Sequence, residues 1–321
     1  MTTQIRTDPG VGDLPEKPEP GRRPRAELAS PFSTGGLVDV VKKRYLLKLL
    51  VQKEIRSRYQ GSVLGFMWSY IQPLTRFCMY FFVIGLVLGL HKNVPNFAIH
   101  MFSAIVGVHY FTETFSSGTR SIVKNKAIVR KMAMPREMFP VSAVIVSAIN
   151  TLPQLLILFI GAVAVGWRPD AEGLLAAVLG LAILTVLGTA LALLFAGFNV
   201  FFRDFQSVVA TFTIFTHWIV PMIYPFEKLA SSPSIGGNTT LYTAYLSNPL
   251  TVAVLLLQRA FWLPTTVGKK GFPDDVHDIG FPYMPHHLML LGVTMLVVST
   301  IFLVLCQMVF RRLEGNFAER L

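Results

Sequence analysis

Residues 119–140, TRSIVKNKAIVRKMAMPREMFP, form a basic segment between two long apolar stretches. If the segment is helical, one side collects the apolar residues and one amide: Ile122, Asn125, Ile128, Val129 and Met132. Its six Lys or Arg residues mark it as cytoplasmic, because basic loops beside membrane segments stay inside. The pattern predicts a short amphipathic helix, Arg120 to Met132, that can contact a cytosolic partner. The alternative is a loop that only sets topology and touches anionic lipid.

The composition places the chain in a bilayer. Of its 321 residues 52% are hydrophobic and only 15% are charged, and the mean hydropathy is +0.52. This is too much apolar side chain for an ordinary soluble domain and predicts an all-α membrane protein that contacts membrane lipids. The net charge of +11 does not indicate a nucleic-acid partner, because the basic residues cluster at the ends of apolar stretches.

The N-terminal part divides into two segments. Residues 1–36 are rich in Pro, Gly and charge, which predicts a disordered cytoplasmic tail rather than a cleaved signal peptide. Residues 37–60 form an amphipathic helix that is expected to lie in the cytoplasmic interface. The alternative is a helix that packs on the protein itself. Its apolar stripe comprises Leu46, Leu47, Leu50, Val51 and Ile55.

Six apolar stretches are expected to span the membrane, at about 63–90, 97–117, 139–165, 174–202, 208–224 and 288–310. The first contains Pro73 and Arg76, a charge that is expensive in a bilayer. The second contains His100, His109 and Glu113, whose spacing does not suit a metal site, so we expect satisfied polar residues that face the bundle.

The stretch between spans five and six is too short to cross. Residues 250–263 would make a helix of about 21 Å, below the roughly 30 Å of a hydrocarbon core. Asn248-Pro249 begins this helix and Pro264 ends it, which predicts a re-entrant pair of half-helices with residues 241–247. The predicted inner segments hold seventeen Lys or Arg residues, and the two short outer turns hold only Lys92 and Arg168. Both termini are therefore predicted to be cytoplasmic.

Motifs for catalysis are not recognisable. Gly268-Lys269-Lys270-Gly271 lacks the upstream glycine and the following Ser or Thr of a nucleotide-binding loop, and no activated Ser or Cys is evident. We expect no enzyme activity and no cofactor in this chain. Cys78 and Cys306 lie in apolar stretches and are expected to pack there. An outer group could bind metal or form a solvated loop: Asp274, Asp275, His277, Asp278, His286 and His287.

Four local patterns in order resemble the transmembrane subunits of ABC-2 type exporters, in the Wzm-like polysaccharide branch. The resemblance covers residues 37–321. The residues that carry it are Arg58-Tyr59-Gln60-Gly61-Ser62-Val63-Leu64-Gly65 with Trp68 and Pro73; Asn125, Lys131, Pro135-Arg136-Glu137 and Pro140; Asn199 with Phe202-Arg203-Asp204; and Glu314 with Phe317-Ala318-Glu319.

The resemblance implies a homodimer that pairs with two cytosolic ABC ATPase subunits, which hold Mg-ATP. Residues 37–60 resemble the gate helix of the family, residues 61–321 its transmembrane domain, and residues 241–263 its outer re-entrant pair. The loop after span two resembles the coupling helix. The residues that would contact the ATPase are then Ile122, Asn125, Ile128, Val129, Arg130, Met132, Pro135, Arg136 and Glu137.

The implied cargo is a polyprenyl-diphosphate-linked polysaccharide that crosses the bacterial cytoplasmic membrane, and the long Pro-rich tail suggests cell-wall galactan. Arg58, Tyr59 and Arg76 are candidates for substrate access and for diphosphate contact. Aromatic rings suit sugar faces, although about half of these rings are expected to pack on lipid or helices: Phe66, Trp68, Tyr70, Phe77, Tyr80, Phe81, Phe212, Phe215 and Trp218. The alternatives are a membrane enzyme acting on polyprenyl-linked sugars through the outer Asp and His group, and an ABC-2 exporter of drugs or small lipids.

Overall fold

The computed structural model describes residues 36–92, 94–132, 134–269 and 272–320 of the chain. These residues form helices, turns and loops, and no strand occurs among them, which confirms the all-α prediction. All of them belong to one compact unit. The predicted tail, residues 1–36, lies outside the described residues apart from Gly36.

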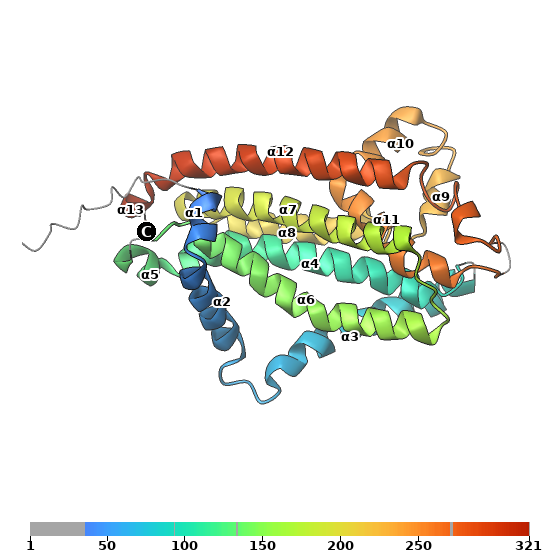
Figure 1. The fold of residues 1–321 in the computed structure, drawn as a ribbon, viewed down its shortest axis with the longest axis horizontal. Helices are drawn as coiled ribbons and strands as arrows, with labels where there is room; N and C mark the ends of the chain where they lie inside the picture. The colour runs from blue at the N-terminus through green and yellow to red at the C-terminus, as the bar shows by residue number, and fades with distance from the viewer. Residues whose placement is uncertain (1–35, 93, 133, 270–271, 321) are drawn as a thin grey trace, which may run out of the picture. The chain divides into compact units, whose positions relative to one another are not determined.

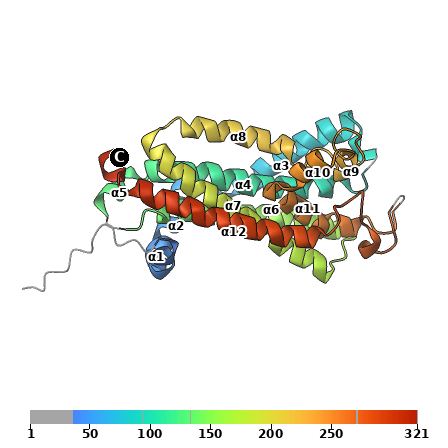
Figure 2. The same ribbon diagram turned by 90° about the horizontal axis from the view of Figure 1, so that it is seen from above.

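Long helices run alongside one another and form the body of this unit (Figures 1 and 2). Helix α7 is central, because α4, α11 and α12 all pack against it. Small residues allow the close approach of α4 and α7: a Cβ atom at Gly118 would lie 2.3 Å from the Cβ of Ala192. The helices of this group are α4 (Phe97–Lys124), α6 (Met138–Ala164), α7 (Ala171–Phe201), α8 (Phe205–Ile219), α11 (Pro249–Phe261) and α12 (Leu288–Glu314).

The N-terminal elements diverge from this body (Figure 1). They are α1 (Leu37–Lys42), α2 (Arg44–Tyr59), η1 (Gly65–Met67), α3 (Trp68–Tyr80), the π-helix η2 (Phe81–Val87) and η3 (Leu90–Lys92). The predicted single helix 37–60 is therefore wrong in one respect: two helices meet at Lys43, whose ψ of 37° is not helical. The apolar stripe packs inward, with Leu50 and Val51 buried, and α2 contacts α6. This agrees with the alternative of a helix that packs on the protein.

The short elements gather at the two ends of the long helices (Figure 1). One end holds α1 with α5 (Lys126–Lys131) and α13 (Phe317–Arg320). The other end holds α9 (Phe226–Ala230), α10 (Thr239–Leu246), η4 (Leu263–Thr265) and η5 (Val276–Asp278).

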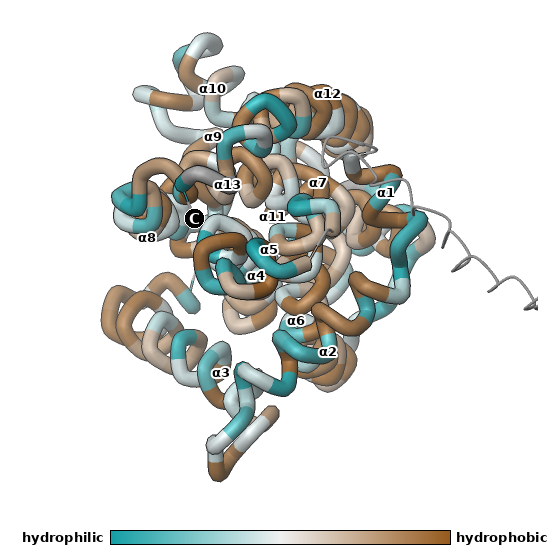
Figure 3. The backbone as a smooth tube through the Cα atoms, turned by 90° about the vertical axis from the view of Figure 1, so that its left-hand side faces the viewer, coloured by the Kyte–Doolittle hydropathy of each residue, from teal (hydrophilic) through white to brown (hydrophobic). Residues whose placement is uncertain are grey.

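Helices with the length and hydropathy of a membrane span match the predicted spans one, three, four and six. They are Gly65–Val87, Met138–Ala164, Ala171–Phe201 and Leu288–Glu314. Hydrophobic residues predominate along α12, whereas α2 is largely hydrophilic (Figure 3). Helices α4 and α8, at predicted spans two and five, are not in this set, and the 15 residues of α8 reach about 22 Å. The six-span topology therefore stays a prediction.

The predicted fifth span, 208–224, is too long at its C-terminal end. Helix α8 ends at Ile219, and Val220 is extended, with φ −86° and ψ 154°. The cause is Pro221, because a proline disfavours helical backbone in the residue before it and cannot donate a hydrogen bond. The chain then leaves the helix toward α9.

The predicted pair of half-helices is present. Helices α10 and α11 are bent by 77° at the break before Pro249, and the side chain of Asn248 caps α11. Tyr245 near the end of α10 lies 3.3 Å from the hydroxyl of Tyr224, just after α8. Beyond α11, Trp262 donates through Nε1 to the carbonyl of Pro95 at 2.8 Å, just before α4. A broken span and a re-entrant pair both fit a bend of this kind.

Candidate functional site

Three adjoining cavities lie along α2, α3 and α4, and Arg58 lines all of them. The joint cavity, about 350 Å³, lies where α2 leads into α3 and is lined by Arg58, Tyr59, Ser62, Trp68, Ser69, Gln72, Pro73, His109, Glu113, Asn150 and Gln154. The arginine groove, about 500 Å³, includes Arg58, Arg76, Tyr80, Arg120, His217 and Trp218. The basal cavity, about 480 Å³, includes Glu54, Arg58, Arg120, Lys124, Asn125 and Gln206.

A polar network closes one wall of the joint cavity. Arg58, at the end of α2, forms an ion pair with Glu113 in the middle of α4. The same Glu113 Oε1 accepts from Asn150 Nδ2 of α6 at 3.1 Å. Tyr59 in turn donates to Asn150 Oδ1 at 2.9 Å, and its hydroxyl lies 2.7 Å from Ser69 Oγ of α3. These contacts connect α2 to three other helices, α3, α4 and α6.

The expectation that the polar residues of predicted span two are satisfied holds only in part, because His100 Nδ1 and Glu113 Oε2 are buried without a hydrogen bond among the described residues. His109 Nδ1 lies 3.1 Å from Gln154 Nε2 and 3.8 Å from Glu113 Oε2. His100 lies apart from them, with its Nε2 atom 3.1 Å from Gln258 Nε2 of α11. The three residues do not form one metal-binding group.

The arginine groove differs from the joint cavity in its charge. Arg76 of α3 and Arg120 of α4 both line it, and neither has a hydrogen bond or ion pair within the part of the chain that the structure describes. Arg58 contributes a third guanidinium, but Glu113 neutralises it. The groove therefore presents two unpaired cations, which suits an anionic group such as a phosphate.

The residues predicted to contact the substrate lie in two different cavities. Arg58 and Tyr59 line the joint cavity and Arg76 lines the groove. Of the nine aromatic candidates, Trp68, Tyr80 and Trp218 line these cavities. The others pack on neighbouring rings or are exposed on the outside of α3 and α8: Phe66 against Tyr59, Tyr70 against Phe66, Phe77 against Phe102, Phe81 against Phe97, Phe212 against Phe115, and Phe215 with its ring exposed.

The predicted continuous helix from Arg120 to Met132 is wrong. Helix α4 continues to Lys124, Asn125 interrupts it, and α5 covers only 126–131. Asn125 has a φ of −103° and a ψ of 20°, and its side chain donates back to Ser121 O at 2.9 Å. An amide that bonds its own backbone in this way competes with helix continuation.

The side of this segment that was expected to meet a partner faces inward. Ile122 and Val129 are buried in a cluster with Val40, Phe310 and Phe317. Asn125 is also buried and Ile128 is half-buried. Of the predicted contact residues in this segment, Arg130 and Met132 are exposed. The other exposed residues of the segment are Arg120, Lys124, Lys126, Ala127 and Lys131. The basic side of α5, rather than its apolar side, is the surface that this end of the protein presents.

The residues after α5 join it to the C-terminal helix. Pro135 is half-buried, and Arg136 donates to the backbone carbonyl of Glu314 and stacks 5.6 Å above the ring of Phe317. Glu137 is buried and accepts from Gln307 Nε2 at 3.3 Å. Burial raises the pKa of the Glu137 carboxyl above its usual value. These residues therefore pack the segment between α5 and α6 against α12 and α13, and they leave little surface for a partner.

Helix α2 also holds the junction between α4 and α5. Lys53 donates to Asn125 Oδ1, the residue at which α4 ends, and Glu54 forms an ion pair with Lys124. With the Arg58–Glu113 pair, α2 makes three polar contacts with α4 and the residue that follows it. These contacts fix α2 against the C-terminal half of α4 and against Asn125, the residue that joins α4 to α5.

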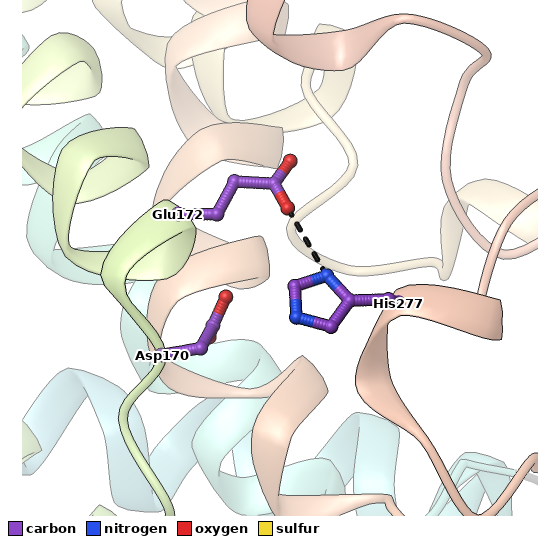
Figure 4. Close-up of side chains that lie close together, drawn as sticks. All are labelled: Asp170, Glu172 and His277. Atoms are coloured by element: carbon purple, nitrogen blue, oxygen red, sulfur yellow. Dashed lines mark ion pairs between the residues drawn. The ribbon is translucent and has the colours of Figure 1, made fainter.

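The outer acidic residues gather differently from the prediction (Figure 4). His277 lies 3.4 Å from Glu172, and Asp170 is close to both. Arg259 already occupies this group, because it donates to both carboxylate oxygens of Asp170 at 3.1 and 2.9 Å and to Glu172 at 3.2 Å. A guanidinium in that position disfavours a metal cation. Asp275 instead caps η5 by accepting from the backbone of His277.

Sequence reasoning missed Gln72, Asn150 and Gln154 as cavity residues. The available signal was their place in apolar stretches: Asn150 and Gln154 are four residues apart and so share one face of α6, as His109 and Glu113 do on α4. Nothing in the sequence indicated that these two faces meet.

Comparisons with known proteins agree with the sequence motifs. Residues 45–262 match the ABC-2 type transporter family. The chain is 30% identical to the O-antigen export system permease protein RfbA of Myxococcus xanthus over 186 aligned residues. The aligned region covers 58% of this chain and 70% of that protein. It is 25% identical over 187 residues to the RfbA protein of Klebsiella pneumoniae, covering 57% and 70% respectively. Since the family match includes more than half of the chain, this protein belongs to the ABC-2 type transporter family.

Proposed function

We propose that the chain is the permease subunit of an ATP-driven exporter that moves a polysaccharide across the bacterial cytoplasmic membrane. The observation that carries this proposal is the similarity to two proteins named as O-antigen export permeases. The chain's own sequence supports a division of labour, because it has no nucleotide-binding loop of the Walker type. Mg-ATP would be bound by two cytosolic ABC ATPase subunits that serve a homodimer of this chain.

The proposed topology has six spans and both termini in the cytoplasm. Two hydrogen bonds at the end of α11 support a re-entrant pair: Gln258 donates to the carbonyl of Pro221, just after α8, at 2.7 Å, and Trp262 donates to the carbonyl of Pro95, just before α4. The chain then returns to the outer turns from which it left α8. The basic α5 lies at the opposite end, next to α13. That end is proposed to be cytoplasmic, as the positive-inside rule requires.

The proposed cargo is a polyprenyl-diphosphate-linked glycan, for which cell-wall galactan is our candidate. Arg76 and Arg120 support an anionic group on the cargo, because both line the groove without a partner in the described residues. Arg58 is less suited to the diphosphate than the sequence indicated, since Glu113 already pairs with it.

The experiment is transport into inverted membrane vesicles that contain this chain and a co-expressed ABC ATPase from the same organism. Inverted vesicles expose the cytoplasmic face, so ATP and radiolabelled lipid-linked glycan are added outside. We expect ATP-dependent protection of the glycan from an added glycosidase. A matched control carries an ATPase whose Walker lysine is replaced. Equal protection with and without ATP, or ATP-driven uptake of a drug dye with no glycan uptake, would contradict the proposal.

A further inference from the structure

The joint cavity has the hydrogen-bonding groups of a site for a polyhydroxyl compound. Hydroxyl, amide and carboxylate groups converge on it from four helices, including Tyr59, Gln72, Glu113 and Asn150. Tyr59, Asn150 and Glu113 are held in place by the Tyr59–Asn150 and Asn150–Glu113 hydrogen bonds, at 2.9 and 3.1 Å. A site whose polar groups are fixed by one another loses little entropy when a ligand binds.

Two acceptors beside the cavity accept no hydrogen bond from the residues that the structure describes. Glu113 Oε2 and Gln154 Oε1 are buried without a hydrogen bond within the described part of the chain, and Gln154 is only 1% exposed. A buried acceptor that lacks a donor costs free energy until a donor reaches it. Hydroxyl groups are such donors, and they need bring no charge into the cavity.

The charge of the lining selects against an anion. Arg58 and Glu113 pair with each other, so their charges cancel. The arginine groove next to the cavity is the opposite case, because Arg76 and Arg120 form no ion pair with any of the described residues. The two spaces therefore suit two chemically different parts of one molecule, an uncharged part and an anionic part.

An aromatic ring completes the lining. Trp68 is 42% exposed at the start of α3 and forms part of the wall. An indole offers a flat apolar face to the C–H groups of a sugar ring, while its neighbours Ser69 and Gln72 offer polar atoms. The volume, about 350 Å³, lies at the lower end of the roughly 300–1,000 Å³ of small-molecule sites.

We propose that the joint cavity is a binding site for an uncharged sugar unit, with Trp68 as the stacking platform and Gln72, Glu113, Asn150 and Gln154 as the hydroxyl-binding groups. The inference rests on the proposed export function, which it deepens by giving the glycan and its diphosphate separate sites. The sugar unit occupies the cavity between α2 and α3, and the anionic group occupies the adjoining arginine groove.

The test measures two probes on the full-length chain in lipid nanodiscs. The first probe is a set of uncharged trisaccharides of galactose, glucose and mannose, whose binding is measured by saturation-transfer NMR. The second probe is inorganic pyrophosphate, whose binding is measured by calorimetry. We expect saturable binding of at least one trisaccharide, weakened about fivefold or more by Trp68→Ala, since an aromatic contact is worth about 1 kcal/mol or more. Pyrophosphate binding should respond to Arg76→Gln and not to Trp68→Ala.

The controls keep the outcome interpretable. Phe82→Ala removes an exposed aromatic ring further along the same span that lines none of the three cavities, so it should leave trisaccharide binding unchanged. Gln72→Ala provides a second cavity variant, with an exposed side chain whose loss should not affect folding. Absence of saturable binding for all three trisaccharides, or equal binding to wild type and to both cavity variants, overturns the inference.

The vesicle assay separates this inference from the proposed function. If trisaccharides fail to bind while ATP-driven glycan uptake occurs, the sugar site is wrong and the export function stands. If trisaccharides bind and depend on Trp68 but glycan uptake is independent of ATP, the site stands and the export function is wrong.

Discussion

At the residue scale, Arg259 is the most constrained charge of the described residues. Its side chain is only 8% exposed, and it is held by Asp170 on two atoms and by Glu172 on one. Burial raises the pKa of Asp170, but the hydrogen bonds and charge of Arg259 outweigh this, so the pKa lies below its usual value. The pair ties the turn before α7 to α11.

We expect Asp170→Asn to destabilise the protein by roughly 2–3 kcal/mol. Breaking a buried ion pair usually costs about 3–5 kcal/mol, and the cost is smaller here because Glu172 still neutralises Arg259. Thermal unfolding in nanodiscs at pH 7 measures the loss. Asp274→Asn, which changes an exposed carboxylate, serves as the control. An unchanged melting temperature in Asp170→Asn would show that the pair contributes nothing.

The same variant carries a pH signature. The folded state holds Asp170 ionised more firmly than the unfolded state does, so the unfolded chain takes up the proton first as the pH falls. The stability from this pair is complete above the unfolded pKa, about 4, and is lost as the pH falls through the lower folded pKa. The difference in melting temperature between wild type and Asp170→Asn should therefore narrow below about pH 4.

At the element scale, the orientation of α5 decides which residues can contact an ATPase. Lys126 and Arg130 are exposed and four residues apart, so they share one face of the helix. We expect the double variant Lys126→Glu and Arg130→Glu to lose most ATP-driven transport with an unchanged melting temperature. Val129→Asp should instead unfold this end, because Val129 is only 9% exposed in an apolar cluster.

A matched control reverses two exposed charges at the other end of the long helices, Lys92→Glu with Arg168→Glu. This variant changes the net charge equally and should transport normally. Transport that survives the α5 double variant, measured in the same vesicles, would exclude α5 as the element that transmits force.

At the scale of the whole molecule, α10 and α11 determine how many times the chain crosses the membrane. If the pair is re-entrant, Ser234 before it and Asp274 after it lie on the same side. In a background without Cys78 and Cys306, single cysteines at these two positions should both react with an impermeant maleimide in intact cells. A cysteine at Lys126 should react only after permeabilisation. Labelling of positions 234 and 274 from opposite sides would contradict the six-span topology.

The rough positions of the long helices could be predicted because each depends on local sequence. Apolar length marked α6, α7 and α12, and Asn248-Pro249 marked the bend between α10 and α11. The errors arose where local sequence leaves two outcomes. The segment around Asn125 has helical residues on both sides, yet a side-chain hydrogen bond to Ser121 ends α4 there.

The candidate site could be predicted only in part. Arg58, Tyr59, Arg76, Trp68, Tyr80 and Trp218 were identified from motifs and aromatic content, and they do line the cavities. Their roles could not follow from the sequence, because Arg58 is neutralised by a glutamate 55 positions away. Gln154 and Asn150 gave only the weak signal of polar residues inside an apolar stretch.

By itself the sequence determined the membrane environment, the helical class and the family, since hydropathy, basic-residue placement and motif order are properties of short segments. Tertiary structure alone decided which face of each helix is buried, which charges pair and where space remains. The physical reason is that these depend on contacts between residues far apart in the chain, such as Arg58 with Glu113 and Lys53 with Asn125. Such contacts form only when helices pack, and packing is not a property of any one segment.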